Sequence, residues 1–315
     1  MVITDRGHRS ANSPARPIEE CHDRQMLVTP LPGTNREHLL ETLRTLHNDA
    51  VNLRGGRADS AYQALLVYLN WSSKSVRMLR NQIRGTDIDR LILTRRHGVL
   101  LDGVGHLAGS DQQSLVNGLV ALELDERIDE LEQAIAEYEQ VSKRWDGERR
   151  LLVPDTTVFI KLPTHIEATD FAALLGGGPE PVHVLVPMQV IDELDRLKES
   201  KDKHVRWRAG RSLAVLDNRI RASGELRPAN TASETDDPPR GAVTVEVLFD
   251  PTGHVRLPDE DDEIIDRAIV AQSLAGKPVT LVTYDTGQSM RAWALDLPVQ
   301  KLRTDAGTGE EPARG

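Results

Sequence analysis

The hydrophobic pattern divides the chain into a first part with helical spacing and a second part with short apolar runs. Between residues 36 and about 149, apolar residues recur three and four positions apart, as at Leu43 and Leu46. Within this part, residues 127–141 carry a narrow apolar seam and predict a long amphipathic helix. We therefore expect residues 34–150 to form a mostly α-helical domain.

Beyond residue 150, short apolar runs alternate with amphipathic stretches of helical spacing. The runs are Leu151–Val153, Val182–Val186 and Val279–Val282. This alternation predicts an α/β domain over residues 151–303, with a parallel sheet covered by helices. Residues 243–257 hold the turn signal Asp-Pro-Thr-Gly between two extended stretches and predict a β-hairpin.

Three polar segments interrupt or flank these patterns. Residues 1–33 and 222–242 are rich in proline and polar side chains, and residues 304–315 lack apolar periodicity. We expect a flexible leader, a flexible insertion and a disordered tail, respectively.

Composition excludes several classes of protein. A single cysteine in 315 residues rules out a disulfide framework and a cysteine-rich zinc site. No apolar stretch approaches the roughly 20 residues that span a bilayer, and the polar N-terminus lacks the apolar core of a signal peptide. We therefore expect a cytoplasmic protein with no membrane partner. The net charge of −10 argues against a generally basic coat, although local basic stripes remain compatible with nucleic acid.

Acidic residues stand at equivalent places along the α/β part. Asp155 directly follows the first apolar run and Asp285 the last, while Glu193 lies on the second turn of the helix after the middle run. Asp262 and Asp266 share one face of a further helix with an acidic start. Taken singly, each of these acids is equally compatible with an ordinary role in a turn, on the surface or at the start of a helix. Because ligands gather beyond the carboxyl ends of parallel strands, we expect these side chains to meet at one sheet edge.

Such a cluster would repel itself and raise its own pKa values. A divalent cation resolves the conflict, and oxygen donors without cysteine favour Mg²⁺ or Mn²⁺ over zinc. Two such ions, roughly 3.5–4 Å apart, are able to activate water and stabilise the leaving oxygen in phosphodiester cleavage.

The ordered acidic segments resemble the motifs of the PIN domain family over residues 151 to about 303, and the first 150 residues show no such resemblance. The segments are Asp155-Thr156-Thr157-Val158, Val190-Ile191-Asp192-Glu193-Leu194, Asp261-Asp262-Glu263-Ile264-Ile265-Asp266-Arg267-Ala268 and Val282-Thr283-Tyr284-Asp285. PIN domains are three-layer α/β/α metal-dependent nucleases, mostly acting on RNA. The long insertion makes the chain more similar to larger PIN domains than to compact toxin-type ones.

The resemblance implies roles for individual residues. The catalytic, metal-holding acids would be Asp155, Glu193, Asp262 and Asp285, with Asp266 as a helper. Thr283 would orient water or a carboxylate. Thr157 departs from the family pattern, because asparagine is common there.

A locally basic stretch, residues 198–211, follows the helix that carries Glu193. We expect Arg206, Arg208 and Arg211 to contact RNA phosphates, since such contacts set the position of nucleic acid. Trp207 is expected to pack rather than to stack on a base.

These observations predict an endoribonuclease that cuts RNA, expected to be single-stranded, by attack of a metal-activated water that leaves a 5′-phosphate. One alternative is a catalytically silent PIN fold that binds RNA or protein. Another is a phosphohydrolase with an aspartyl nucleophile, which the threonine at position 157 disfavours. Homodimerisation through residues 120–145 is a further hypothesis.

Overall fold

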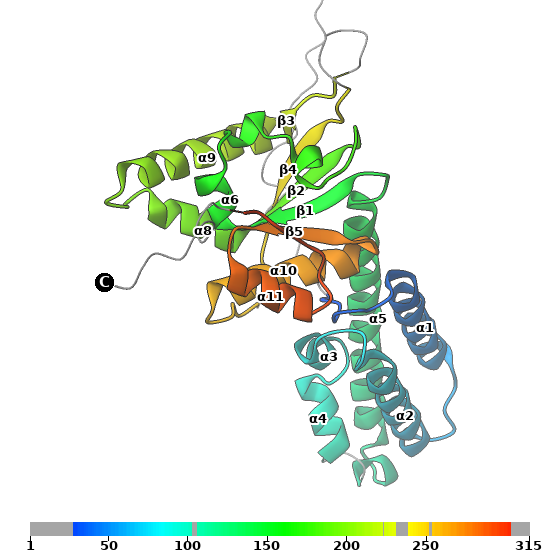
Figure 1. The fold of residues 1–315 in the computed structure, drawn as a ribbon. Coiled ribbons are helices and arrows are strands. Elements are labelled where there is room, and N and C mark those ends of the chain that lie inside the picture. The colour runs from blue at the N-terminus through cyan, green and yellow to red at the C-terminus, as the bar shows by residue number, and fades with distance from the viewer. Residues whose placement is uncertain (1–27, 103–105, 223, 231–238, 252–253, 304–315) are drawn as a thin grey trace, which may run out of the picture.

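The computed structural model describes residues 28–102, 106–222, 224–230, 239–251 and 254–303. A bundle of helices forms the N-terminal part, and a six-stranded sheet with helices on both sides forms the C-terminal part (Figure 1). Both architectures agree with the prediction. Among the described residues, no helix has the length and apolar content needed to cross a membrane.

The N-terminal bundle contains five α-helices among the described residues. They are α1 (Arg36–Gly55), α2 (Ala61–Leu79), α3 (Gly85–Leu91), α4 (Arg95–Asp102) and α5 (Gln113–Arg144). The side chains of Asn35 and Ser60 cap the first two helices by accepting hydrogen bonds from the first-turn amides of His38 and Gln63. Polar caps therefore fix where these helices begin.

The apolar seam of α5 packs against other helices of the same chain. Its buried residues include Val120, Leu131 and Tyr138, and the helix packs along α1 and α2. The seam from which we inferred a homodimer is thus covered by neighbouring helices, and that inference loses its basis. The end of the expected leader is also packed, because Val28 and Thr29 are buried and the amide of Thr29 donates to Asp87.

The sheet has the strand order β3-β4-β2-β1-β5-β6. Its strands are β1 (Arg150–Pro154), β2 (Val182–Pro187), β3 (Glu225–Arg227), β4 (Val243–Leu248), β5 (Val279–Thr283) and β6 (Val299–Lys301). All neighbours are parallel except β3, which is antiparallel to β4. The near-continuous burial of β1 and β2 fits strands covered on both faces.

The chain reverses its direction across the sheet at β1. From β1 it proceeds through β2 to β4, and it then returns to β5 on the other side of β1. The gap between the carboxyl ends of β1 and β5 is therefore the topological switch point, where open α/β sheets bind ligands.

The helices of this part lie in two groups. The first connections hold α6 (Thr156–Lys161), α7 (Phe171–Leu174), α8 (Met188–Leu197) and α9 (Lys203–Ala222). The later ones are α10 (Glu260–Ala275) and α11 (Thr286–Ala294). Figure 1 shows α8 and α9 on one side of the sheet and α10 and α11 on the other, which completes the three layers.

The predicted hairpin over residues 243–257 is wrong. β4 pairs with β2 and β3, and residues 254–257 belong to no strand; residues 252 and 253 of the expected turn lie outside the described residues. Instead, Arg256 binds Asp250 and Asp192, so this segment is held by ion pairs rather than by a ladder.

The predicted flexible insertion is ordered where the structure describes it. Within residues 222–242, β3 occupies the sheet edge with Leu226 buried, and Asn230 forms a bridge with Arg240. Residues 231–238 of the insertion, residues 1–27 of the leader and the tail from 304 lie outside the described residues.

Candidate metal-dependent active site

Asp155 is a buried carboxylate at the carboxyl end of β1. Its side chain caps α6 by accepting the amide hydrogen of Val158 at 3.0 Å, which explains locally why the helix begins here. Asp155 is 2% exposed, and burial raises the pKa of its carboxyl group. The residue that interrupts the apolar run is therefore a charged group held inside the molecule at the switch point.

Two threonine hydroxyls fix the Asp155 carboxylate. Thr157 Oγ1 lies 2.7 and 2.8 Å from its two oxygens, and Thr283 Oγ1 donates to Oδ2 at 2.7 Å. Thr283 Oγ1 also accepts the amide hydrogen of Asp285 at 2.8 Å. The Thr283 hydroxyl thus links β1 to the turn that carries Asp285, which is the geometry of a carboxylate-orienting residue. The sequence does not predict this role of Thr157, because Thr157 stands out in it only as a departure from the family pattern.

Asp261 is the acid of α10 that couples most clearly to the switch point. Burial raises the pKa of Asp261, and the charge of Asp285 raises it further. Asp261 in turn raises the pKa of Asp155. The sequence favours Asp262 for this place. The acid of α10 whose charge acts on Asp155 is instead its neighbour Asp261, and adjacent helical positions point about 100° apart.

Glu193 lies on the second turn of α8, as the sequence predicted. Burial raises the pKa of Glu193, while Thr156 and Gln189 oppose that increase. Gln189 Nε2 donates to Glu193 Oε1 at 3.2 Å. Because Thr156 directly follows Asp155, Glu193 borders the same region from the α8 side.

Arg291 of α11 supplies a positive charge to the acidic start of α10. Its guanidinium lies 2.8 Å from Asp261 Oδ2 and 2.8 Å from Asp262 Oδ1, and 3.6 Å from Asp259 Oδ1. Arg291 is therefore the cation that partly neutralises this cluster. Asp262 takes part in the site through this contact.

The comparison with protein families agrees with this geometry. Residues 152–303 match the sequence model of the PIN domain. This segment is a PIN domain. No curated protein matches the chain. The matched range begins inside β1 and ends after β6, so it contains most of β1, the other five strands and every acid described above.

Asp266 is bound by two arginines. Its two oxygens accept hydrogen bonds from Arg84 Nη2 at 2.8 and 2.7 Å, and Arg267 also contacts it. Burial would raise the pKa of Asp266, but Arg267 and Arg84 outweigh that effect and lower it. The sequence predicts that Asp266 helps to hold metal, whereas in the structure both of its oxygens bind Arg84 of the N-terminal bundle.

A second group with metal-like spacing lies in the PIN domain. The ligand atoms of Asp250, His254 and Glu263 are within 4.8 Å of one another, the only such trio among the described residues, and the acids at the switch point stand farther apart. However, His254 Nε2 lies 2.7 Å from Glu263 Oε1 and His254 Nδ1 lies 3.1 Å from Arg84 Nη1. Both ring nitrogens are thus engaged, and these contacts identify the trio as part of a charge-balanced structural network.

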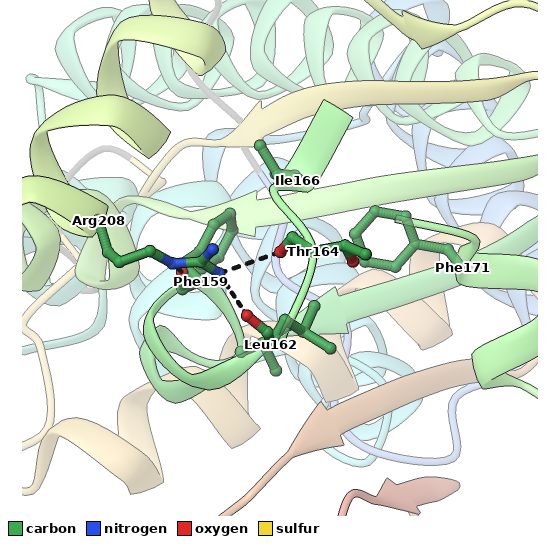
Figure 2. A pocket seen from close by; sticks show the side chains of 7 residues that line it. Phe159, Leu162, Thr164, Ile166, Phe171 and Arg208 are labelled. Atoms are coloured by element: carbon green, nitrogen blue, oxygen red, sulfur yellow. Dashed lines mark hydrogen bonds between the residues drawn. The ribbon is translucent and has the colours of Figure 1, made fainter. Parts of the chain in front are cut away.

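The three arginines expected to contact RNA have different environments. Arg208 is 4% exposed, and it donates to the carbonyls of Phe159, Leu162 and Thr164 at 2.8–3.1 Å. Figure 2 shows its guanidinium turned toward Leu162 and Thr164. The prediction that Arg208 contacts phosphate is therefore wrong, because its donors hold the loop after α6.

Arg206 and Arg211 remain on the surface of α9. Arg206 Nη1 donates to the carbonyl of Ser200 at 2.8 Å, and Arg211 forms an ion pair with Glu167. Trp207, which we expected to pack, is 53% exposed. That prediction is also wrong, because the buried face of α9 is taken by Arg208 and other residues.

Proposed function

We propose that the PIN domain is a Mg²⁺- or Mn²⁺-dependent ribonuclease that hydrolyses phosphodiester bonds within single-stranded RNA. The observation that carries the proposal is the buried Asp155, which Thr157 and Thr283 fix at the switch point and whose pKa the charge of Asp261 raises. Burying a carboxylate costs folding free energy, which hydrogen bonds from neutral groups offset only in part. Such local costs are typical of functional sites, where strongly perturbed groups gather for chemistry.

The donor set fits a hard divalent cation. Asp155, Asp261 and Asp285 offer carboxylate oxygens, with Glu193 and Asp262 at the borders of the same region. Oxygen donors of this kind suit Mg²⁺ and Mn²⁺. Burial is the main cause of the raised pKa values of Asp155 and Asp261, and neighbouring carboxylates raise both further. A bound cation would oppose both effects, because it stabilises the charged form of each acid.

A divalent cation bound by these acids would supply the positive charge that activates water and stabilises the leaving oxygen of a phosphodiester. The residues of the chain would contribute rigid placement. The single hydroxyl of Thr157 lies within hydrogen-bond distance of both Asp155 oxygens, and Thr283 donates to one of them. The carboxylate is therefore poorly suited to attack phosphorus itself. This favours hydrolysis over an aspartyl-phosphate mechanism.

The test compares the full-length parent with Asp155→Asn on labelled single-stranded RNA in the presence of Mn²⁺. We expect the substitution to lower kcat/KM by about 100-fold or more, the upper range seen when a metal site is disturbed. The matched control is Asp125→Asn, which removes an exposed carboxylate on α5. This helix belongs to the N-terminal bundle and not to the PIN domain. It should leave the rate unchanged.

Cleavage that is equal in the parent and Asp155→Asn would refute the proposal. Binding of Mn²⁺ to the parent, measured by calorimetry without RNA, gives a second readout. If neither cleavage nor Asp155-dependent Mn²⁺ binding is seen, the catalytically silent binding module becomes the better account.

A further inference from the structure

A strip of aromatic and basic side chains runs along the surface beside the acidic site. We call it the Trp207 strip, and it consists of Tyr284, Lys161, His165, Trp207 and Arg211. These residues come from three neighbouring places in the PIN domain: the turn after β5, α6 with the loop that follows it, and α9.

Trp207 presents an aromatic ring to solvent in a chain with few aromatic residues. Its side chain is 53% exposed although only 3% of the chain is aromatic. The ring centroid lies 5.3 Å from that of His165, and the guanidinium of Arg211 lies 5.8 Å from the Trp207 ring. A π surface flanked by an imidazole and a guanidinium is therefore held on the outer face of α9.

The strip is continuous with the acids. Lys161 Nζ lies 5.9 Å from the centroid of the Tyr284 ring, and Tyr284 directly precedes Asp285. The amide of Tyr284 donates to Thr157 Oγ1, the hydroxyl that fixes Asp155. At its other end, α6 is capped by Asp155, and six helical residues span about 9 Å. Lys161 therefore lies one or two nucleotide lengths from the buried acid.

From this arrangement we infer that the Trp207 strip binds single-stranded nucleic acid, with a base stacked on Trp207 and phosphates near Lys161. This inference rests on the proposed function for its choice of RNA as the ligand. Single strands expose the π faces that duplex pairing hides, and proteins bind them through aromatic rings beside cationic side chains. Arg211 shares its charge with Glu167, and Lys161 adds a second cation to the strip. A small aromatic surface beside basic side chains suits a polyanion better than a protein partner.

The inference is tested by equilibrium binding of a fluorescent single-stranded RNA to the full chain in EDTA, where metal-dependent cleavage is blocked. Trp207→Ala should raise the Kd by about 5- to 100-fold, the range for losing one stacked base. Trp207→Phe, which keeps an aromatic ring, should retain most of the affinity of the parent. The matched control is Tyr62→Ala, because Tyr62 is an aromatic residue of α2 with the same exposed fraction of 53%. The control should bind like the parent.

Additional comparisons separate stacking from a general charge effect. The parent should prefer the single strand to a duplex of the same sequence, and Lys161→Ala should reduce the salt dependence of binding. In cleavage assays, Trp207→Ala should raise KM more than it lowers kcat, since stacking binds substrate and transition state alike. Thermal unfolding midpoints that match the parent would show that these exposed substitutions leave the fold intact.

Unchanged binding by Trp207→Ala, or equal affinity for duplex and single strand, would overturn the inference. Trp207-dependent binding without any Mn²⁺-dependent cleavage would support the strip while refuting the nuclease. The two proposals therefore fail on different measurements.

Discussion

At the scale of single residues, the acidic site is a balance between buried negative charge and the groups that tolerate it. Asp155 is held by hydroxyls and an amide, which favour its charged form, yet burial still raises its pKa. Asp261 experiences the same burial effect and the charge of Asp285, against which only Arg291 acts. Two kinds of substitution test this balance.

The first prediction concerns Asp155 and pH. A carboxyl group whose pKa is raised by folding stabilises the fold below its unfolded pKa, and this contribution is lost as pH rises through the folded pKa. Asp155→Asn removes that titration. We expect the metal-free variant to gain stability relative to the parent as pH rises from about 4 toward neutrality, and the gain to level off above the raised pKa. Urea unfolding in EDTA at several pH values measures it; a gain that does not change with pH would contradict it.

The second prediction concerns competition between Arg291 and a cation. The guanidinium is 41% exposed and contacts Asp261 and Asp262. Exposed ion pairs contribute at most about 1 kcal/mol, so Arg291→Gln should tighten Mn²⁺ binding by up to about fivefold. Calorimetry without RNA measures the Kd, with Arg206→Gln as the control, since Arg206 donates to a backbone carbonyl instead. Weaker Mn²⁺ binding in Arg291→Gln would show that the arginine supports the site rather than competes for it.

At the scale of elements, α9 shows how one basic helix divides its side chains between core and surface. Arg206 and Arg208 are two positions apart and therefore point to nearly opposite faces of the helix. Arg208 joins α9 to the end of α6 through three carbonyls and His165 Nδ1. Burial lowers the pKa of Arg208. The sequence shows a basic run, and only the packing of α9 decides which arginine becomes structural.

The third prediction follows from that division. Arg208→Ala leaves several buried carbonyl oxygens without donors, each costing about 1–3 kcal/mol, so we expect a loss of roughly 3 kcal/mol or more in the free energy of unfolding. Arg206→Ala removes an exposed side chain and should stay within about 0.5 kcal/mol of the parent. Urea denaturation of both variants provides the measurement. Equal stability of the two variants would mean that the buried contacts of Arg208 contribute nothing.

At the scale of the whole molecule, the N-terminal bundle is tied to the helix that carries the third acid. Arg84, at the start of α3, binds Asp266 of α10 through two hydrogen bonds and also contacts His254. Arg36 of α1 donates to the carbonyl of Ala275 at the C-terminal end of α10. The bundle thus holds α10 near its middle, at Asp266, and at its C-terminal end, at Ala275. Two contacts along one helix limit its rotation about its own axis, and that rotation decides which acid of its first turn is directed to the site.

The fourth prediction tests this anchor by a double-mutant cycle with Arg84→Ala and Asp266→Ala. The side chains are 29% and 26% exposed, so we expect a coupling free energy of about 1–3 kcal/mol. The lowered pKa of Asp266 means that its stabilisation is present above the unfolded pKa and is lost as pH falls through the folded pKa. The coupling should therefore shrink in acid. The control cycle, Arg54 with Asp125, joins side chains that are 44% and 51% exposed and should give less than about 1 kcal/mol at all pH values.

The sequence by itself determined the main helical region and the central strands, because periodicity and capping are local properties. Leu151–Val153 and Val279–Val282 were recognisable as buried strands, and Asp155 and Asp285 as acids at their ends. The parallel order of those strands follows from the alternation of elements. The resemblance to the PIN domain family was recognisable for the same reason, because each of its motifs is a short continuous segment of the chain.

Only the tertiary structure decided which of several equivalent side chains reaches the site. Asp261 and Asp262 are indistinguishable in an acidic run, as are Arg206 and Arg208 in a basic one, because their roles depend on the rotation of a helix about its axis. That rotation is set by contacts from residues far away in the chain, such as Arg84 on Asp266. The sequence did not predict the partners of β4 for a similar reason. Strand pairing joins segments that are far apart in the chain, and no local sequence pattern identifies the partner.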